Sequence, residues 1–282
     1  MRNVEQQQYW DELAPTWIGA QKDLEGVGGW FGDRAIDQLQ VTAGERVVDI
    51  GCGTGETTVA LARAAGTAGS AVGADISTAM IEEARRRTAQ LSDVNVSFVV
   101  ADAEEAPVAE GADVVFSRFG VMFFADPPLA FGNLRASLRS GGRLAAVVWQ
   151  QVFSNEWMLL PGMATLTATG ALPPMPGEGE PGPFSLSDPD RFRALLDQAG
   201  FVDVDVQPLQ HEVVVERARV DFFVEQSMAV GAAREGVRAA GDDPAVATAI
   251  AQQLRRDLLD RIGEEPATGL SAAAWLATAR KP

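Results

Sequence analysis

A short stretch between positions 49 and 55 carries residue types that bind small ligands: Asp49 and the glycines Gly51, Gly53 and Gly55. The stretch follows a β-branched run and precedes a segment with apolar residues at helical spacing. Glycine at such a turn lets a ligand approach the backbone closely, because a Cβ would obstruct it or penalise a positive φ. The sequence therefore predicts a small-ligand site at this turn.

The spacing of the glycines narrows the type of ligand. The dinucleotide fingerprint requires G-x-G-x-x-G, but here the third glycine comes one residue early, at Gly55, and Glu56 stands at the fingerprint position. The turn also has no Lys or Arg to bind a pyrophosphate. A ligand with an amino acid group in place of phosphates fits better.

Two more carboxylates follow the next two strand-like runs. Asp75 ends the run 71–75, where a carboxylate can accept hydrogen bonds from both hydroxyls of a ribose. Asp102 follows the run 96–100, and it could equally serve as a turn or helix-cap residue. Acidic or glycine residues at three successive strand ends are more specific than any one of them.

His211 is the only histidine and the first candidate for a general base, because its unperturbed pKa lies close to neutrality. Its position between two strand-like runs fits a structural histidine equally well. Glu156 and Tyr9 are weaker candidates for the base. With one histidine and one cysteine, the sequence predicts no transition-metal site.

The elements around these residues alternate between strand and helix. We expect strands at 46–50, 71–75, 96–100, 113–117 and 143–149, separated by helical segments. This alternation is typical of βαβ units around a parallel sheet. The predicted class is α/β, a Rossmann-like, mostly parallel sheet with helices on both faces.

We expect the segments before and after this core to cover it. We divide the chain into an N-terminal helical lid (1–32), the core (33–150), a loop-rich substrate-side insertion (151–188) and a final part (189–282). That final part completes the sheet and contains a helical insertion at about 217–262. The tail from 272 to 279 is the expected last strand.

The stretch from Val47 to Trp149 resembles the class I S-adenosylmethionine (SAM)-dependent methyltransferases, in the branch similar to ubiquinone and menaquinone biosynthesis enzymes. Asp49 to Gly55 matches the first motif of that family nearly residue for residue. Gly73-Ala74-Asp75-Ile76-Ser77, Asp102-Ala103 and Ser117-Arg118-Phe119 resemble the motifs that follow. The resemblance implies a seven-stranded sheet with an antiparallel last strand, and SAM as cofactor.

The resemblance also implies which residues hold the cofactor. Asp49 would place the SAM amino group, Ile76 and Met80 would line the adenine, and Asp102 would accept from the adenine amino group. The full cofactor set is Trp17, Asp49, Gly51, Cys52, Gly53, Asp75, Ile76, Met80, Asp102, Ala103, Ser117 and Phe119. Met80 could equally be an ordinary core residue of a helix, and the Cys52 thiol could be a small side chain that only fills space in the core.

Aromatic residues indicate which part of the site would bind the methyl acceptor. Trp10 and Trp17 resemble an N-terminal segment that folds over SAM in the family, or they belong to a helix packed on the domain edge. Phe123 could face either cofactor or core. The set we assign to the substrate is Trp10, Phe123, Trp149, Trp157 and Met158. These residues favour an apolar or aromatic acceptor.

Composition limits the partners and the location. The formal net charge of -16 disfavours a nucleic-acid substrate, because such affinity depends on Lys and Arg. A single cysteine allows no internal disulfide, and no long apolar run predicts a membrane span. We expect a cytoplasmic protein whose partner is a small molecule.

The predicted function is methyl transfer from SAM to a small apolar or aromatic acceptor, with S-adenosylhomocysteine as product. It would proceed mainly by proximity and in-line alignment, without metal. Two alternatives stay open: a SAM-binding enzyme that uses the cofactor for a non-methylating reaction, and an NAD-dependent oxidoreductase. The glycine spacing and the missing Tyr-x-x-x-Lys pair disfavour the oxidoreductase.

Overall fold

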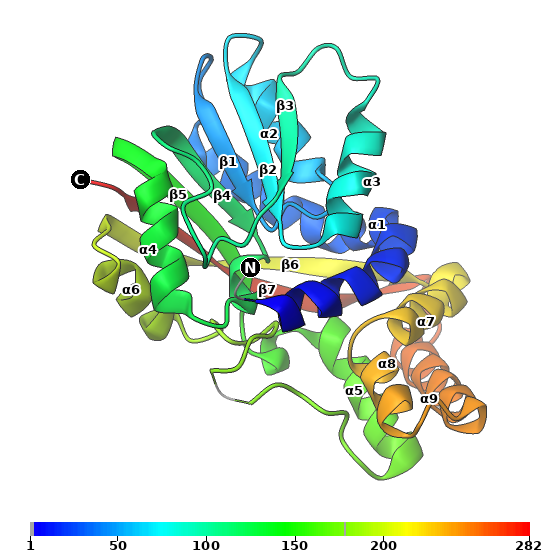
Figure 1. Cartoon of the computed structure of the whole chain (residues 1–282). Coiled ribbons are helices and arrows are strands. Elements are labelled where there is room, and N and C mark those ends of the chain that lie inside the picture. The colour runs from blue at the N-terminus through cyan, green and yellow to red at the C-terminus, as the bar shows by residue number, and fades with distance from the viewer. Residues whose placement is uncertain (1–2, 178) are drawn as a thin grey trace.

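A seven-stranded sheet organises the computed structural model, which describes residues 3–177 and 179–282, with the backbone alone for 22–24 (Figure 1). The strands are β1 (Arg46–Ile50), β2 (Ser70–Asp75), β3 (Val96–Val100), β4 (Ala112–Arg118), β5 (Leu138–Trp149), β6 (Val202–Glu216) and β7 (Ala267–Arg280). Their order is β3-β2-β1-β4-β5-β7-β6. Strands β1 to β5 pair in parallel, and β7 pairs antiparallel with β5 and β6. The predicted fold class and the antiparallel last strand are both confirmed.

Helices cover both faces of this sheet. Helix α2 (Glu56–Ala65) contacts β1 and β2, and α3 (Thr78–Thr88) contacts β2 and β3. Helices α4 (Pro127–Ser137) and α6 (Pro189–Gln198) pack against each other in front of the sheet in Figure 1, and α2 lies behind it. A parallel sheet needs this double cover because both of its faces are apolar.

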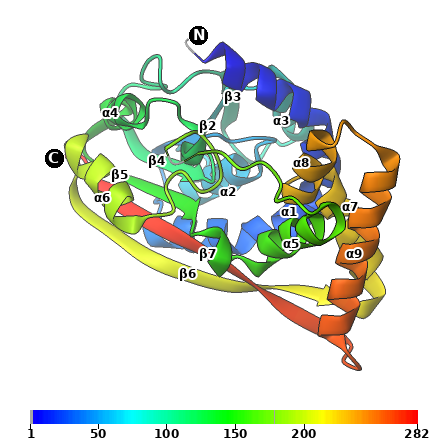
Figure 2. The ribbon, with the colours of Figure 1, turned by 90° about the horizontal axis from the view of Figure 1, so that it is seen from below.

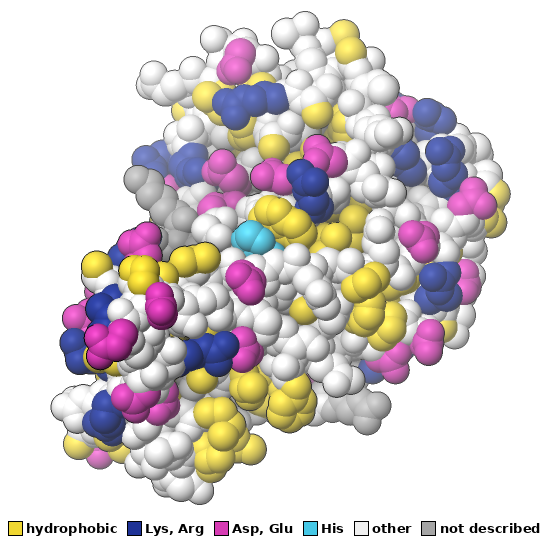
Figure 3. All heavy atoms as spheres, turned by 180° about the vertical axis from the view of Figure 1, so that it is seen from behind, with side chains coloured by type: hydrophobic (Ala, Val, Ile, Leu, Met, Phe, Trp, Pro, Cys, Tyr) yellow, Lys and Arg dark blue, Asp and Glu magenta, His cyan; other side chains and the backbone are white. Residues whose placement is uncertain are grey.

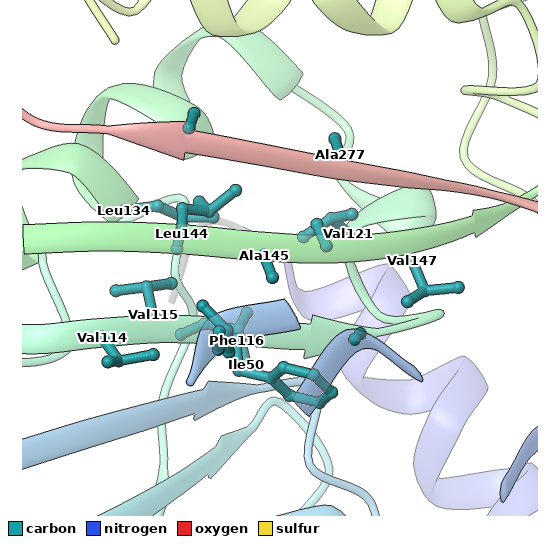
Figure 4. Packing of buried hydrophobic residues seen from close by; sticks show 14 of the residues in the cluster. Ile50, Val114, Val115, Phe116, Val121, Leu134, Leu144, Ala145, Val147 and Ala277 are labelled. Carbon is teal, nitrogen blue, oxygen red and sulfur yellow. The ribbon is translucent and has the colours of Figure 1, made fainter. Parts of the chain in front are cut away.

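The main core lies between the sheet and these helices. Figure 4 shows Phe116 of β4 among side chains of β4 and β5, including Leu144. Both side chains are fully buried or nearly so. Phe131 of α4 and Phe192 of α6 are also completely buried, with ring centroids 6.0 Å apart. Burying each such side chain stabilises the fold by roughly 1.5–3 kcal/mol.

The N-terminal segment forms one helix of 36 residues, α1 (Val4–Leu39). Its second half packs on the sheet and buries Phe31 and Ala35 in the main core, while its first half reaches α3. Figure 2 shows α1 crossing the molecule in this way. Because α1 continues across position 32, the predicted lid and the start of the core are a single helix.

Four helices form a second layer beside the far ends of β6 and β7: α5 (Glu156–Thr169), α7 (Val220–Ala229), α8 (Ala232–Ala239) and α9 (Pro244–Ile262) (Figure 1). Helices α5, α7 and α9 share a separate apolar core that includes Val224, Leu254 and Leu258. Helix α8 contributes Ala233 and Val237 to a smaller apolar cluster. The predicted helical insertion is thus three helices, preceded by the short η3 (Arg217–Arg219).

The insertion at 151–188 differs from the loop-rich segment that we expected. It begins with η2 (Val152–Ser154) and then forms the 14-residue helix α5. This helix packs against α8, α9 and β7 at once, so it is apolar on several sides and shows no clear periodicity. Pro161 lies inside the helix, and a proline is otherwise a signal against a helix interior.

In the described part of the chain, no helix is both long and apolar enough to cross a membrane.

Candidate cofactor and substrate site

The glycine turn follows β1 with a backbone that favours glycine. Gly51, Gly53 and Gly55 have φ values of 66°, 52° and 88°, in the left-handed region. The amides of Gly51 and Cys52 both donate to the carbonyl of Ala74 at the end of β2, at 2.8 and 3.1 Å. Apart from Gly53 and its two chain neighbours, no described residue has a heavy atom within 4 Å of where a Cβ of Gly53 would be, so this part of the turn faces open space.

Asp49 lies beneath this turn and is completely buried. Its Oδ2 accepts hydrogen bonds from the hydroxyls of Thr57 and Thr58, at 2.7 and 2.6 Å, but its Oδ1 has no partner in the described part of the chain. Burial raises the pKa of Asp49 to about 6. A buried carboxylate oxygen without a partner is costly, and a ligand ammonium group would satisfy it. Asp49 therefore fits the predicted role.

Asp75 connects the turn to helix α3. Its Oδ2 accepts from the amide of Gly53 and its Oδ1 from the amide of Ser77, both at 2.9 Å. Burial raises the pKa of this carboxyl as well. Each carboxylate oxygen can accept a second hydrogen bond, so Asp75 can hold the turn and still bind ribose hydroxyls.

Asp102 is buried and already bonded to the start of α1. Its Oδ2 accepts from the amide of Asn3 at 3.3 Å, and its Oδ1 accepts from the amide of Glu104 at 2.9 Å. The side-chain amide of Asn3 also donates to Glu104, at 2.5 Å. The carboxylate that the resemblance assigns to the adenine amino group therefore binds the start of the N-terminal helix in this structure.

A second contact of α1 was not predicted. The Oδ1 of Asp11 accepts from the hydroxyl of Ser77 at 2.6 Å and from the amide of Ala79 at 3.3 Å. Ser77 is the N-cap of α3, and its own oxygen accepts from the amide of Met80. Helix α1 thus crosses the carboxyl ends of β2 and β3 and covers the predicted adenine side of the site.

The end of β4 completes the site with Ser117 and Phe119. The Ser117 hydroxyl donates to the carbonyl of Ile50 at 2.9 Å, which fixes β4 beside the glycine turn. Phe119 has a φ of 60°, an unfavourable conformation for an aromatic residue. Between them, Arg118 forms a two-point ion pair with Glu25 of α1.

The remaining predicted cofactor residues have different surroundings. The Cys52 side chain is buried in a cluster with Ile81 and Phe98, and burial raises the pKa of its thiol well above the usual value. Ile76 is half-buried beside Asp75, whereas Met80 is 95% buried and Ala103 packs in the main core.

Aromatic side chains gather next to the site in two groups. Trp10 of α1 packs edge-on against Phe123 of η1 (Val121–Phe123) and against Trp17, with centroids 4.8 and 5.7 Å apart. Trp149 stacks on Phe119 at 3.8 Å and contacts Trp157 at 5.4 Å. The Met122 sulfur accepts from the amide of Trp149, so the two groups adjoin. Met158 packs against the main core.

His211 is not brought together with the glycine turn. Its ring stacks on Trp30 of α1 at 4.8 Å, and its edge contact is Phe31, at 6.1 Å. Figure 3 shows the histidine at the surface beside hydrophobic side chains, where it lines a cavity of about 410 Å³ with Ser154 and Glu212. The base role of His211 stays a prediction.

Glu156, the weaker candidate for the base, is held by structural contacts. Its Oε2 accepts from the amide of Ser271 at 3.1 Å and pairs with Arg261 at 3.0 Å, and these contacts lower its pKa. Among the described residues, no group of three or more His, Cys, Asp or Glu side chains is placed to hold a metal ion.

Comparisons with known proteins agree with this geometry. A family model described as "Methyltransferase domain" matches residues 41–169. The aklanonic acid methyltransferase DauC of Streptomyces sp. (strain C5) is 37% identical over 116 residues, which are 41% of this chain and 53% of that protein. The demethylmenaquinone methyltransferase of Staphylococcus carnosus is 28% identical over 187 residues, 62% of this chain and 75% of that protein.

Solved structures share the fold. The YcgJ protein of Bacillus subtilis aligns with 89% of this chain and 98% of its own, with a TM-score of 0.55 and 16% identity. Phosphoethanolamine N-methyltransferase 2 of Haemonchus contortus, solved with S-adenosylhomocysteine, aligns with 91% of this chain and 53% of its own, with a TM-score of 0.54 and 18% identity.

The chain spans only 53% and 36% of the length of the first two curated relatives it matches. The match nevertheless includes the whole glycine turn, Asp75, Asp102 and the end of β4. Residues 41–169 therefore resemble a methyltransferase domain.

Proposed function

We propose that this protein binds SAM at the turn 49–55 and transfers its methyl group to a small apolar or aromatic acceptor. One observation carries the proposal: the completely buried Asp49 has an oxygen with no partner among the described residues, beneath the open turn at Gly53. An amino acid ligand whose ammonium group binds that oxygen fits the turn better than a phosphate does.

The side chains of this protein would mainly bind SAM and the acceptor and orient them for methyl transfer. When bound, SAM supplies a methyl group that its sulfonium already activates. Asp49 holds the ammonium group, Asp75 the ribose and Asp102 the adenine amino group, while the backbone of Gly51 to Gly53 contacts the methionine part. Helix α1 covers the site and excludes water. Such alignment can contribute effective molarities of the order of 10⁵ to 10⁸ M.

The acceptor would lie beside Trp10, Phe123, Trp149, Trp157 and Met158. An aromatic cluster at the carboxyl edge of an α/β sheet favours a flat apolar molecule. Relatives named for aklanonic acid and demethylmenaquinone support a small-molecule acceptor. A cytoplasmic location and the exclusion of nucleic acids stay predictions from composition.

Measuring the products of turnover distinguishes this proposal from the alternative of a SAM-binding enzyme that does not transfer the methyl group. Purified protein would be incubated with methyl-labelled SAM and a panel of hydroxylated aromatic compounds, and S-adenosylhomocysteine and labelled product would be quantified. We expect equal amounts of both products, and smaller amounts of both with Asp49→Asn when SAM is below saturation. Conversion of an acceptor without release of S-adenosylhomocysteine would support the non-methylating alternative.

A further inference from the structure

Two threonines in the first turn of α2 donate to the same oxygen of Asp49. The hydroxyl of Thr57 lies 2.7 Å from Oδ2 of Asp49, and the hydroxyl of Thr58 lies 2.6 Å from it. All three side chains are buried. Two hydroxyl donors on one carboxylate oxygen stabilise the charged form of the acid. They also leave the other oxygen, Oδ1, without a partner among the described residues.

Neighbouring elements hold both threonine side chains in place. A Cβ on Gly73 of β2 would lie 2.8 Å from Oγ1 of Thr58, so this hydroxyl lies close to the backbone of β2. A Cβ on Gly32 of α1 would lie 3.6 Å from the methyl carbon of Thr57, so the backbone of α1 lies beside the other threonine. Threonine also has few rotamers, because its Cβ is branched. The two donors are therefore preorganised toward Asp49.

The charged groups around Asp49 contribute less than these hydroxyls to keeping it ionised. Burial has the largest effect and raises the pKa of Asp49, and the two threonine hydroxyls oppose it more than any charge does. Arg118, which is paired with Glu25 of α1, also lowers this pKa, whereas Asp75 raises it. The thiol of Cys52 is the neighbouring titratable group in the turn, and burial raises its pKa well above the usual value.

We propose that Thr57 and Thr58 are positioning residues for the amino acid end of the ligand. Their hydroxyls hold the Asp49 carboxylate as an anion whose Oδ1 is free to accept from a protonated amine. The inference rests on the proposed function and assigns to α2 a selectivity that the glycine turn alone does not provide. The turn admits a nucleoside, and the carboxylate that the threonines hold favours a nucleoside that carries an ammonium group.

Valine has nearly the shape of threonine but no hydroxyl, so Thr57→Val and Thr58→Val test the two donors separately. Titration calorimetry from pH 5 to pH 8.5 would measure the affinity of each full-length variant for S-adenosylhomocysteine. The midpoint pH, at which the affinity is half its value at high pH, should rise by about one unit when one donor is lost. At pH 6 the affinity should fall about fivefold. Thr58→Ser keeps the hydroxyl and should restore the wild-type midpoint.

A second ligand distinguishes positioning from general damage to the turn. The thioether 5′-deoxy-5′-methylthioadenosine contains the nucleoside of S-adenosylhomocysteine but lacks its amino acid part, so it has no ammonium group for Asp49. Thr57→Val and Thr58→Val should bind it within about twofold of wild type.

Thr165 of α5 offers a matched control. It is a buried threonine whose hydroxyl donates to the carbonyl of Pro161 at 2.9 Å. Thr165→Val therefore also removes one buried hydroxyl and its hydrogen bond. It should leave both the affinity for S-adenosylhomocysteine and the midpoint pH as in wild type.

An unchanged midpoint pH in both valine variants would overturn the inference, and so would equal weakening of S-adenosylhomocysteine and the thioether nucleoside. Failure of the wild-type protein to bind S-adenosylhomocysteine would instead contradict the proposed function itself.

Discussion

Gly51 and Gly120 meet backbone to backbone at the carboxyl ends of β1 and β4. A Cβ on Gly51 would lie 2.8 Å from the Cα of Gly120, and a Cβ on Gly120 would lie 2.9 Å from the Cα of Gly51. Neither position has room for a side chain. Gly53, two residues further on, has a positive φ but faces open space. One turn therefore combines a glycine needed for packing with one that leaves room for a ligand.

Alanine at these two glycines should have different effects. Gly51→Ala should lower the free energy of unfolding by about 2–4 kcal/mol, because it adds overpacking to backbone strain. Gly53→Ala adds strain alone, about 1–2 kcal/mol, but should weaken SAM binding at least about tenfold by filling the open side of the turn. Denaturant titration and calorimetry measure the two quantities. A Gly53→Ala protein that binds SAM as wild type does would contradict this division.

Asp49 should make SAM binding depend on pH. Its pKa is raised to about 6 by burial, and only the ionised carboxylate attracts an ammonium group. Between pH 7 and pH 5 the affinity for SAM should therefore fall about tenfold. Calorimetry across this range should show a flat profile for Asp49→Asn at a lower overall affinity. An equal pH dependence in wild type and Asp49→Asn would assign the titration to another group.

The same group should affect the stability of the ligand-free protein in the opposite sense. Because the pKa of Asp49 is higher in the folded chain than its ordinary value of 3.8, the folded state holds the proton more tightly than the unfolded state does. The free energy of unfolding should fall as pH rises from about 4 to about 6, by roughly 2–3 kcal/mol relative to Asp49→Asn, and then level off. Parallel stability curves for the two proteins in this window would refute it.

Asp11 should matter for cofactor binding more than for folding. Its carboxylate holds α1 on the N-terminus of α3 through Ser77 and Ala79. Asp11→Ala should weaken SAM binding by about three- to tenfold, because the two charge-assisted hydrogen bonds that join α1 to α3 are lost. Limited proteolysis of α1 with and without SAM would show the loosened cover. Asp33→Ala, at an exposed position of the same helix, is the matched control and should change neither SAM binding nor the proteolysis of α1.

His211 should contribute packing, and we expect His211→Phe to preserve turnover within about twofold. The substitution keeps the ring that stacks on Trp30 and meets Phe31. A general base contributes roughly 10²–10⁴-fold to a rate. A fall in kcat of this size, together with loss of the acidic limb of the pH profile, would restore His211 as the base.

Local sequence patterns predicted the parts of the site that lie along single strands and turns. The bounds of β1 and β3 agree with the apolar runs at 46–50 and 96–100, and Asp49, Asp75 and Asp102 lie at strand ends as expected. These features depend on residues close together in the chain. Gly120, two residues after β4, is a further local signal of the close packing at Gly51.

Contacts between distant segments could not be predicted in this way. Asp11 and Asn3 look like ordinary surface residues in sequence, yet they bond to Ser77 and Asp102, 66 and 99 residues away. Such pairings depend on where α1 crosses the sheet, which no local pattern specifies. His211 was chosen for its intrinsic pKa, whereas its location is set by the register of β6 with β7.

Calorimetric titration of the protein with SAM, S-adenosylhomocysteine and NAD at pH 7.5 tests the central claim most directly. We predict saturable binding of SAM and S-adenosylhomocysteine with one site per chain, reduced by Asp49→Asn, and no saturable binding of NAD. Saturable binding of NAD without binding of SAM would contradict the account.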